Sequence, residues 1–217
     1  MERAIVLLSG GIDSAVTLWW ARKQGWDVHP LTFDYFGRPR REHTAVEALV
    51  KEAGVPPTRT VDLPFLKEVD DLRAAGLANP VLKDSPEGYI PARNLIFYSL
   101  AAYYAELEGS RYLVGGHNGV DPASFPDASP RFFEFLNSVF RLSLWSYDAS
   151  PVQVVVPLSG KSKEDVLRLG QDLGVPFGLT WSCYWDREVH CGTCVSCRER
   201  RDAFAALGLT DPVAYEA

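Results

Sequence analysis

Short apolar runs alternate along the chain with longer segments in which apolar residues recur every three or four positions. The short runs predict strands and the longer segments predict helices, because these two periodicities match a pleated strand and one face of a helix. The predicted strands are residues 5–8, 28–33, 60–63 and 111–114, and the predicted helices cover 15–20, 41–53 and 91–107. Strands that alternate with helices in this order predict an α/β fold with a parallel sheet. Pro91 is expected in the first turn of the last of these helices.

The segment 66–87 interrupts this alternation. It is polar and contains Gly76, Pro80 and Pro86, which break regular structure. We predict an irregular excursion of the kind that covers the strand ends, as lids do. Ligands of an open parallel sheet bind beyond the carboxyl ends of the strands, so the loops after the first, second and fourth predicted strands are expected to converge on the site.

The first predicted strand ends in the sequence SGGIDS, residues 9–14, and a helix follows. Gly10 and Gly11 carry no Cβ, so the backbone can turn sharply there and come close to a ligand. The first amides of the following helix have no partner within the helix, and phosphate oxygens are their natural acceptors. Ser9 and Ser14 add hydroxyl donors, so the turn is suited to a pyrophosphate group.

Asp13 has two interpretations: it caps the helix, or it holds a divalent cation against a polyphosphate. The turn has neither the Gly-Lys-Ser/Thr ending of a P-loop nor the GxGxxG spacing of a dinucleotide-binding fold. An ordinary Gly-Gly turn before a capped helix is the structural alternative. The favoured interpretation is a site for the phosphates of a nucleotide.

The SGGxDS pattern resembles the PP-loop of the N-type ATP pyrophosphatases, and residues 9–14 are called the PP-loop below. The resemblance implies an enzyme that splits ATP into AMP and pyrophosphate while it adenylates a substrate oxygen, with Mg²⁺ near Asp13. The adenine is expected beside the second strand, at residues 31–34. The ATP-binding residues that the resemblance implies are Leu8, Ser9, Gly10, Gly11, Ile12, Asp13, Ser14, Ala15, Val16, Thr17 and Leu18.

The chain has four cysteines, and all of them lie near its C-terminus: Cys183, Cys191, Cys194 and Cys197. Two overlapping CxxC steps and one cysteine upstream provide four soft ligands that a short loop can arrange as a tetrahedron, which favours zinc. Two disulfides and an iron–sulfur cluster are the alternatives. Four thiolates would leave zinc no open coordination position, so the metal is expected to be structural. His190 is expected to be an outer neighbour of the site or a surface residue.

Composition and charge exclude several classes of partner. The chain has 217 residues, 47% of them hydrophobic, and a formal net charge of −6. It therefore has no overall basic field that would attract nucleic acid or an anionic membrane. No apolar run approaches the roughly 20 residues of a membrane helix, and the start MERAIVLL leads into a strand without a cleavable signal. We expect a cytoplasmic protein that acts on a small molecule, with a homodimer as one possible assembly.

Several motifs in fixed order extend along nearly the whole chain. They are SGGIDS at 9–14, FDY at 33–35, IPARN at 90–94, FPD at 125–127, PL at 157–158 followed by Lys163, SCY at 182–184, CGTCVSC at 191–197 and DPVAY at 211–215. In these motifs the chain resembles the 7-cyano-7-deazaguanine synthases, the QueC family. The resemblance implies an adenine nucleotide alpha hydrolase-like α/β domain of the Rossmann-like HUP and PP-loop group at residues 1–160. A small helical segment with the zinc site would follow at 161–217, either as a separate part or as one compact unit with the first.

The family resemblance also implies a reaction. An ATP-dependent carbon–nitrogen ligase would convert 7-carboxy-7-deazaguanine and ammonia to 7-cyano-7-deazaguanine through adenylated intermediates, in queuosine biosynthesis, with Mg²⁺ and Zn²⁺ as cofactors. The implied catalytic residues are Asp13, Arg93 and Lys163. Arg38, Arg93 and Asp127 are the implied substrate-binding residues.

Several candidate side chains, including two aromatic residues beside Cys183, also have a purely structural interpretation. Arg93 could form a surface salt bridge, and Lys163 could be the solvated start of a helix. Asp127 either accepts hydrogen bonds from a guanine-like edge or caps a helix that begins near residue 131. Trp181 and Tyr184 either stack on the base or pack in the core.

The chain departs from the family pattern at two places. FGRP at 36–39 stands where the family usually has Gly-Gln-Arg-His, and Ala128-Ser129 stands where it usually has Cys-Arg. These differences leave open a PP-loop enzyme that adenylates another deazapurine or a small carboxylate. The remaining alternatives are a tRNA-modifying PP-loop enzyme, which the acidic net charge disfavours, and a nucleotide-binding module without catalysis.

Overall fold

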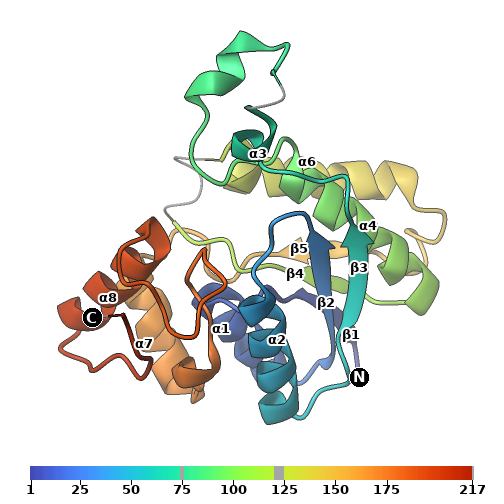
Figure 1. Cartoon of the computed structure of the whole chain (residues 1–217). Coiled ribbons are helices and arrows are strands. Elements are labelled where there is room, and N and C mark those ends of the chain that lie inside the picture. The colour runs from blue at the N-terminus through green and yellow to red at the C-terminus, as the bar shows by residue number, and fades with distance from the viewer. Residues whose placement is uncertain (74–75, 120–124, 217) are drawn as a thin grey trace.

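A parallel sheet of five strands forms the centre of the molecule (Figure 1). This computed structural model describes residues 1–73, 76–119 and 125–216. The strands are β1 (Arg3–Leu7), β2 (Asp27–Tyr35), β3 (Arg59–Leu63), β4 (Tyr112–Val114) and β5 (Gln153–Val155), in the order β3-β2-β1-β4-β5. The four predicted strands are confirmed, with β2 two residues longer at its carboxyl end than predicted. The sequence analysis missed β5, although the apolar run VQVVV at 152–156 was a usable signal.

Helices cover both faces of the sheet. The long helices are α1 (Ile12–Lys23), α2 (Arg40–Ala53), α4 (Arg93–Glu108), α6 (Pro130–Ser143), α7 (Lys163–Leu173) and α8 (Val195–Ala206). Alternate residues of β1 separate the two cores: Ala4 and Val6 pack with α1, α2, α7 and α8, whereas Ile5 packs with α4 and α6. This period of two is the expected behaviour of a strand that is buried on both faces.

The strand order places a crevice between β1 and β4. The chain moves outward from β1 to β2 and β3, and then returns to the other side of β1 through β4 and β5. Loops that leave β1 and β4 therefore diverge to opposite faces, and ligands of open α/β sheets bind at such a point. The PP-loop follows β1, and Gly115 and Gly116 follow β4.

The segment 66–87 is only partly irregular. It contains the short helix α3 (Val69–Arg73) and a 3₁₀ turn (Pro80–Asp84), and it projects from the carboxyl end of the sheet in Figure 1. Its role as a lid stays a prediction. Pro91 was expected in the first turn of the next helix, which is wrong. Helix α4 begins at Arg93, and its N-cap is Ala92 in the left-handed region, with φ 54°.

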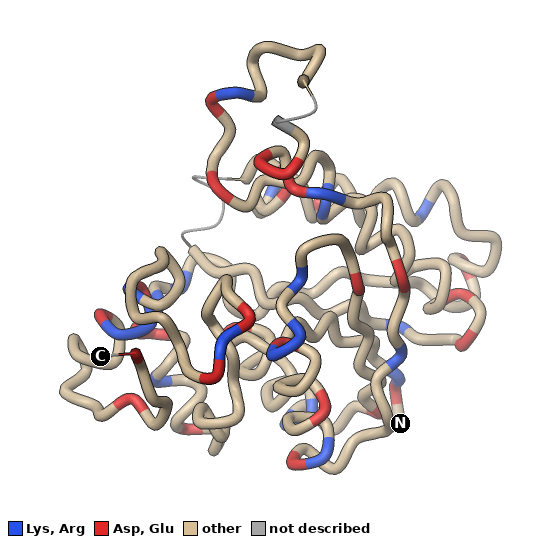
Figure 2. The backbone as a smooth tube through the Cα atoms, viewed as in Figure 1, with Lys and Arg blue, Asp and Glu red and all other residues tan. Residues whose placement is uncertain are grey.

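Charged residues are distributed over all parts of the described chain. Figure 2 shows Lys and Arg interspersed with Asp and Glu along the backbone. None of the helices in the described ranges is long and apolar enough to cross a membrane.

Helices α1 and α7 pack closely because α7 has a glycine at the contact. A Cβ at Gly170 would lie 2.4 Å from Cζ of Phe177 and 2.8 Å from Cγ2 of Val16. The absence of a side chain at this position therefore allows the C-terminal segment to approach the first helix.

We expect Gly170→Ala to destabilise the protein by about 1–3 kcal/mol, because the added methyl group would overpack the contact. The sign is informative, since the same change in an open helix interior usually stabilises. The free energy of unfolding in urea measures the effect, and Asp172→Ala, on the exposed face of α7, is the control that should change it by less than about 0.5 kcal/mol. A stabilised Gly170→Ala variant would show that the two helices are not in close contact.

Candidate active site and metal centre

The PP-loop turns sharply between β1 and α1. Gly10 has φ +93°, and a Cβ there would lie 2.7 Å from the carbonyl oxygen of Glu42, so only glycine fits. The N-cap of α1 is Gly11, and no side chain caps it. Of the two interpretations of Asp13, the helix cap is therefore wrong. The open helix start leaves its first amides available to an anion.

The two serines of the PP-loop are joined to each other. Oγ of Ser9 lies 3.1 Å from Oγ of Ser14, which donates to the carbonyl of Gly11 at 3.1 Å. These bonds close the turn and hold both hydroxyl groups on one side of it. Such a turn is preorganised for oxygens of a phosphate group.

A cavity of about 260 Å³ lies at the crevice of the sheet. Its wall includes Leu31, Thr32 and Phe33 of β2, where the adenine was expected, and Phe97 of α4 stacks on Phe33 with ring centres 4.0 Å apart. The predicted site residues that line it are Leu8, Ser9, Asp13, Ser14, Arg38 and Arg93. The tertiary structure thus brings together side chains from four separate segments.

Not all of the run Leu8–Leu18 reaches this cavity. Ile12, Ala15, Val16 and Leu18 pack in the core beneath α1, and buried Thr17 donates its hydroxyl to the carbonyl of Asp13 at 2.8 Å. These residues could therefore contribute to ATP binding only by supporting the PP-loop from below.

Asp13 and Lys163 form an ion pair across 150 residues of sequence, with 2.6 Å between Oδ2 and Nζ. Lys163 is the first residue of α7, whose start is capped by Ser162 and Asp165 rather than by the lysine. The second oxygen of Asp13, Oδ1, is buried and has no hydrogen-bond partner in the described part of the chain. A buried carboxylate oxygen without a partner is costly unless a cation or donor occupies its vicinity.

A second cavity, of about 570 Å³, lies on the other side of this ion pair. Asp13 lines both cavities, and the second is also bordered by Lys163, Asn118, Phe125 and Tyr184. Gly116 allows the loop after β4 to approach the start of α1, because a Cβ there would lie 2.9 Å from the backbone carbonyl carbon of Asp13. The Asp13–Lys163 pair therefore stands where two cavities meet.

Arg93 and Arg38 both line the first cavity but have different surroundings. Among the described residues, no carboxylate forms an ion pair with Arg93, and its guanidinium lies 5.4 Å from the ring centre of Phe125. The salt-bridge interpretation of Arg93 thus finds no support. The side chain of Arg38, in contrast, is 2% exposed and forms an ion pair with Glu42 at 2.8 Å.

Asp127 lies beside the start of α4. Its Oδ2 accepts a hydrogen bond from the amide of Asn94 at 2.9 Å, and the Asn94 side chain donates to the carbonyl of Asp127 at 2.9 Å. The expected cap of the helix near residue 131 is instead Ser129, whose hydroxyl accepts from the amide of Phe132. Asp127 is not among the described residues that line either of the two cavities.

His117 was missed by the sequence analysis. It follows the glycine pair after β4 and lines the first cavity, with its ring centre 4.8 Å from that of Phe133. Burial, and then the positive charge of Arg93, lower the pKa of His117 to about 4. The imidazole is therefore neutral near pH 7.

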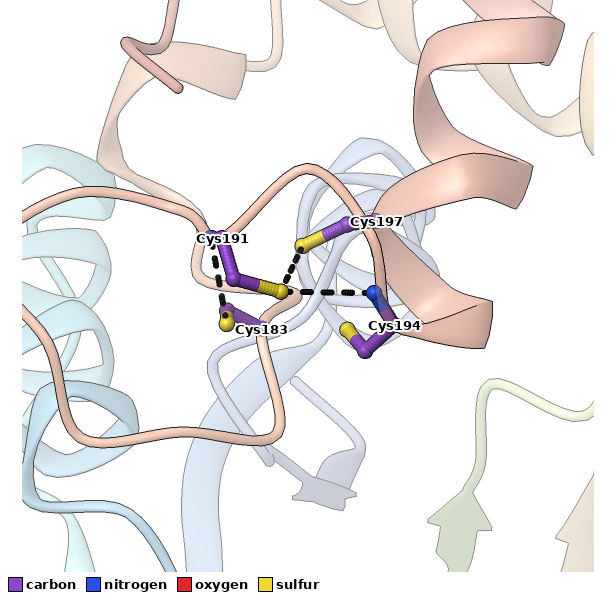
Figure 3. Close-up of side chains that lie close together, drawn as sticks. All are labelled: Cys183, Cys191, Cys194 and Cys197. Carbon is purple, nitrogen blue, oxygen red and sulfur yellow. Dashed lines mark hydrogen bonds between the residues drawn. The ribbon is translucent and has the colours of Figure 1, made fainter. Parts of the chain in front are cut away.

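The four cysteines converge at the start of α8, and their side chains point toward one another in Figure 3. All four sulfur atoms lie within 4.8 Å of one another, and all four thiols are free, so the disulfide alternative is wrong. Four ligands at about 2.3 Å from one metal ion would be about 3.8 Å apart. The Sγ atoms of Cys191 and Cys197 are separated by 3.9 Å, so the arrangement fits a single tetrahedral ion.

Backbone amides donate to the sulfur of Cys191 and favour its thiolate form. Burial acts to raise the pKa of Cys191, but the amides of Cys194 and Thr193 donate to its sulfur and lower that pKa to about 6. The thiolate form, which binds metal, is therefore favoured at this ligand. Burial raises the pKa of Cys183 and Cys197, which a bound cation would offset.

The aromatic and histidine neighbours of the cysteines have separate positions. Trp181 packs in the core with Cys183, Cys191 and Cys197, as the structural interpretation predicted. Tyr184 lines the second cavity and is 40% exposed. His190 is buried, and its Nε2 accepts from the amide of Ser182 at 3.1 Å, so it supports the segment from inside.

The depressed pKa of His117 predicts a pH dependence of stability. Between the pKa of about 6.5 in the unfolded chain and the value of about 4 in the folded protein, the unfolded chain binds more protons. Stability should therefore decrease as pH falls through this window, by about 1–2 kcal/mol from this group between pH 7 and 5. Urea unfolding at both pH values measures it, and His117→Gln should lose that part of the slope. An unchanged slope would show that His117 titrates alike in both states.

The family comparison covers almost the whole chain. The family model described as "Queuosine biosynthesis protein QueC" matches residues 3–208. Proteins named 7-cyano-7-deazaguanine synthase match over nearly their full length. That of Nostoc punctiforme is 36% identical over 98% of this chain and 99% of its own, and that of Thermosynechococcus vestitus is 38% identical over 99% and 96%. The protein of Methanothrix thermoacetophila is 36% identical over the whole of both chains.

Solved structures show the same type of fold at lower identity. The NMN synthetase of Francisella tularensis has a TM-score of 0.56 and 18% identity, covering 96% of this chain and 78% of that chain. A predicted subunit of tRNA methyltransferase from Methanocaldococcus jannaschii has a TM-score of 0.51 and 19% identity over 79% and 75%. These similarities concern the fold alone, whereas the sequence matches over the whole length concern the family. The chain belongs to the QueC family of queuosine biosynthesis proteins.

Proposed function

We propose that this protein is an ATP-dependent synthase that converts 7-carboxy-7-deazaguanine and ammonia to 7-cyano-7-deazaguanine. The observation that carries the proposal is the match over full length with proteins of that name, in a chain whose PP-loop, Lys163 and Arg93 meet at one crevice. The reaction class would be carbon–nitrogen ligation driven by ATP.

The chemistry explains why a PP-loop is needed. A carboxylate does not expel oxide, so its oxygen first attacks the α-phosphorus of ATP and pyrophosphate leaves. Ammonia then adds to the carbonyl carbon, and AMP leaves to give the amide. Adenylation of the amide oxygen by a second ATP allows loss of AMP and two protons, which gives the nitrile.

Each part of the crevice has a task in this scheme. The PP-loop amides and the hydroxyls of Ser9 and Ser14 would hold the β- and γ-phosphates, which leave as pyrophosphate. The guanidinium of Arg93, which has no ion pair within the described residues, can bind a phosphate or the substrate carboxylate through two hydrogen bonds. The neutral His117 adds no charge there. Lys163 would face the phosphates from the other side of Asp13.

The carboxylate of Asp13 suits Mg²⁺. Its buried oxygen Oδ1 has no partner within the described residues, and a hard divalent cation prefers such ligands. When bound, Mg²⁺ would neutralise charge on the pyrophosphate as it leaves. Lys163 would hold the other carboxylate oxygen, Oδ2, through their ion pair.

The second cavity is the proposed site of the deazapurine, because it adjoins the Asp13–Lys163 pair and has aromatic walls in Phe125 and Tyr184. Asp127 was expected to bind the base. Its bonds to Asn94 favour a different contribution, in which it fixes the start of α4 and thereby the direction of Arg93.

Purified protein with ATP, Mg²⁺, ammonium and 7-carboxy-7-deazaguanine is expected to release AMP and pyrophosphate and to form the nitrile, with the amide as a transient species. Pyrophosphate release and mass spectrometry of the base measure the two halves of the reaction. Parallel reactions with other carboxylated deazapurines and with tRNA test the alternatives. Turnover of another acid, with none of this one, would mean changed substrate specificity.

Arg93→Lys should reduce turnover by about tenfold or more, because an ammonium group cannot form the two parallel hydrogen bonds of a guanidinium. Arg22→Lys is a matched control, since exposed Arg22 also lies over an aromatic ring, that of Trp19, near the C-terminal end of α1. Equal activity of both variants would exclude a bidentate role for Arg93.

We propose zinc as the metal of the four cysteines. The sulfur atoms are too close together to enclose a multi-iron cluster, and four thiolates leave zinc without an open position, as in structural sites. Zinc would then stabilise the fold of the C-terminal segment without taking part in the reaction. The cytoplasmic location expected from the sequence would keep these thiols reduced and available to a metal.

Elemental analysis is expected to find about one zinc and almost no iron per chain. Cys183→Ser should lose the metal and lower the melting temperature, because one ligand of a closed site is replaced by a poor one. A Cys183→Ser variant that keeps its metal, or a preparation that contains iron, would contradict the assignment.

We also propose that the chain forms a homodimer through α6. Phe135, Val139 and Leu142 form an exposed apolar stripe on α6, with exposed fractions of 59%, 50% and 88%. Two antiparallel copies related by a two-fold axis would cover each other's stripe, and Glu134 of one copy would lie near Arg141 of the other. An apolar stripe with an acidic residue near one end and a basic residue near the other would thus suit a second copy of itself.

Light scattering is expected to give twice the mass of the chain. Leu142→Glu should convert the protein to a monomer, because it places like charges in an apolar contact. Leu107→Glu, at another exposed apolar position on α4, is the control. A monomeric wild-type protein would exclude the dimer.

A further inference from the structure

We infer that Arg38 is a positioning residue that holds the PP-loop in its phosphate-binding shape, rather than a ligand of the substrate acid. The inference rests on the proposed use of ATP at this crevice. It changes the role that the sequence analysis gave to Arg38, and it separates the tasks of the two arginines of the first cavity.

The guanidinium of Arg38 is surrounded by protein acceptors. Nε donates to Glu42 at 2.8 Å, Nη1 donates to the hydroxyl of Thr32 at 2.8 Å and to the carbonyl of Phe33, and Nη2 donates to the carbonyl of Ser9 at 2.8 Å. All three nitrogens are therefore engaged, and the side chain is 2% exposed. Little of the group remains free to bind a substrate carboxylate.

The contact with Ser9 lies at the point where the chain turns. The neighbouring carbonyls are also occupied: that of Gly10 accepts from the amide of Trp181 at 2.9 Å, and that of Gly11 accepts from the amide of Ala15 at 3.0 Å. The C=O and N–H of a planar trans peptide point in opposite directions. When the carbonyls are held by the protein, the amides that follow them are turned to the opposite side, where the phosphates would lie.

Arg38, which donates to the carbonyl of Ser9, is itself anchored to regular secondary structure. Thr32 and Phe33 belong to β2, and Glu42 belongs to the first turn of α2, so the guanidinium links the loop to a strand and a helix. Burial raises the pKa of Glu42 and the charge of Arg38 opposes that shift, so the two side chains depend on each other. A lysine could replace the charge but not the four contacts.

The role predicts a selective loss of affinity. AMP has no β- or γ-phosphate, whereas α,β-methylene-ATP carries both and is not cleaved between its α and β positions. Arg38→Lys should weaken binding of α,β-methylene-ATP with Mg²⁺ by about 10- to 100-fold, the effect of one charge-assisted hydrogen bond. The affinity for AMP should change less, because AMP has neither of the phosphates that the PP-loop amides would hold. Calorimetric titration measures both constants.

Two further variants separate positioning from general instability. The double variant Arg38→Gln with Glu42→Gln leaves no buried charge without a partner, so it keeps the test valid if Arg38→Lys does not fold, and it should show the same selective loss. Leu49→Ala truncates a fully buried side chain of α2. It should lower the melting temperature but keep the ratio of the two affinities.

The possible outcomes are distinct. Unchanged affinity for α,β-methylene-ATP, or an equal loss of both affinities, would overturn the positioning role of Arg38. If the wild-type protein binds the analogue no more tightly than AMP, both this role and the proposed use of ATP fail. If it binds the analogue more tightly but does not convert the acid, the proposed reaction fails and the positioning role stands.

Discussion

The PP-loop depends on hydrogen bonds to its carbonyl groups from three different parts of the chain. Arg38 binds the carbonyl of Ser9, the amide of Trp181 binds that of Gly10, and α1 itself binds that of Gly11. A loop rich in glycine has many conformations, and ordering it costs about 1–2 kcal/mol per residue. These contacts supply that order before any ligand arrives, which is the condition for strong electrostatic binding of a phosphate.

The contact of Trp181 connects the loop to the metal centre. Trp181 lies two residues before Cys183, and its indole donates to the carbonyl of Cys183 at 2.9 Å. A second anchor lies further on, where fully buried Arg200 donates twice to Asp211, at 2.8 and 2.9 Å. The cysteine segment is therefore part of the architecture of the crevice. Structural stabilisation by a metal in this segment would also fix one side of the PP-loop.

The ligands proposed for the crevice, phosphates and a divalent cation, have opposite charges and need different protein groups. Anionic phosphates need amides and cations, and a divalent cation needs a free carboxylate oxygen. Within the described residues only one oxygen of Asp13 is paired, with Lys163, and the other is left for the proposed cation. The two arginines also differ. All three nitrogens of the Arg38 guanidinium donate to protein groups, whereas Arg93 has no ion pair in the described residues.

The sequence by itself determined the parallel sheet, the position of the PP-loop and the four clustered cysteines, because these follow from local periodicity and from ligand spacing. It missed β5, although the apolar run at 152–156 could have predicted it. Only the tertiary structure decided which distant groups meet: Lys163 pairs with Asp13 across 150 residues, Asp127 accepts from the amide of Asn94 in the first turn of α4, and His117 lines the first cavity. Such contacts depend on how the helices pack on the sheet, and no local pattern in the sequence records which distant group a side chain will meet.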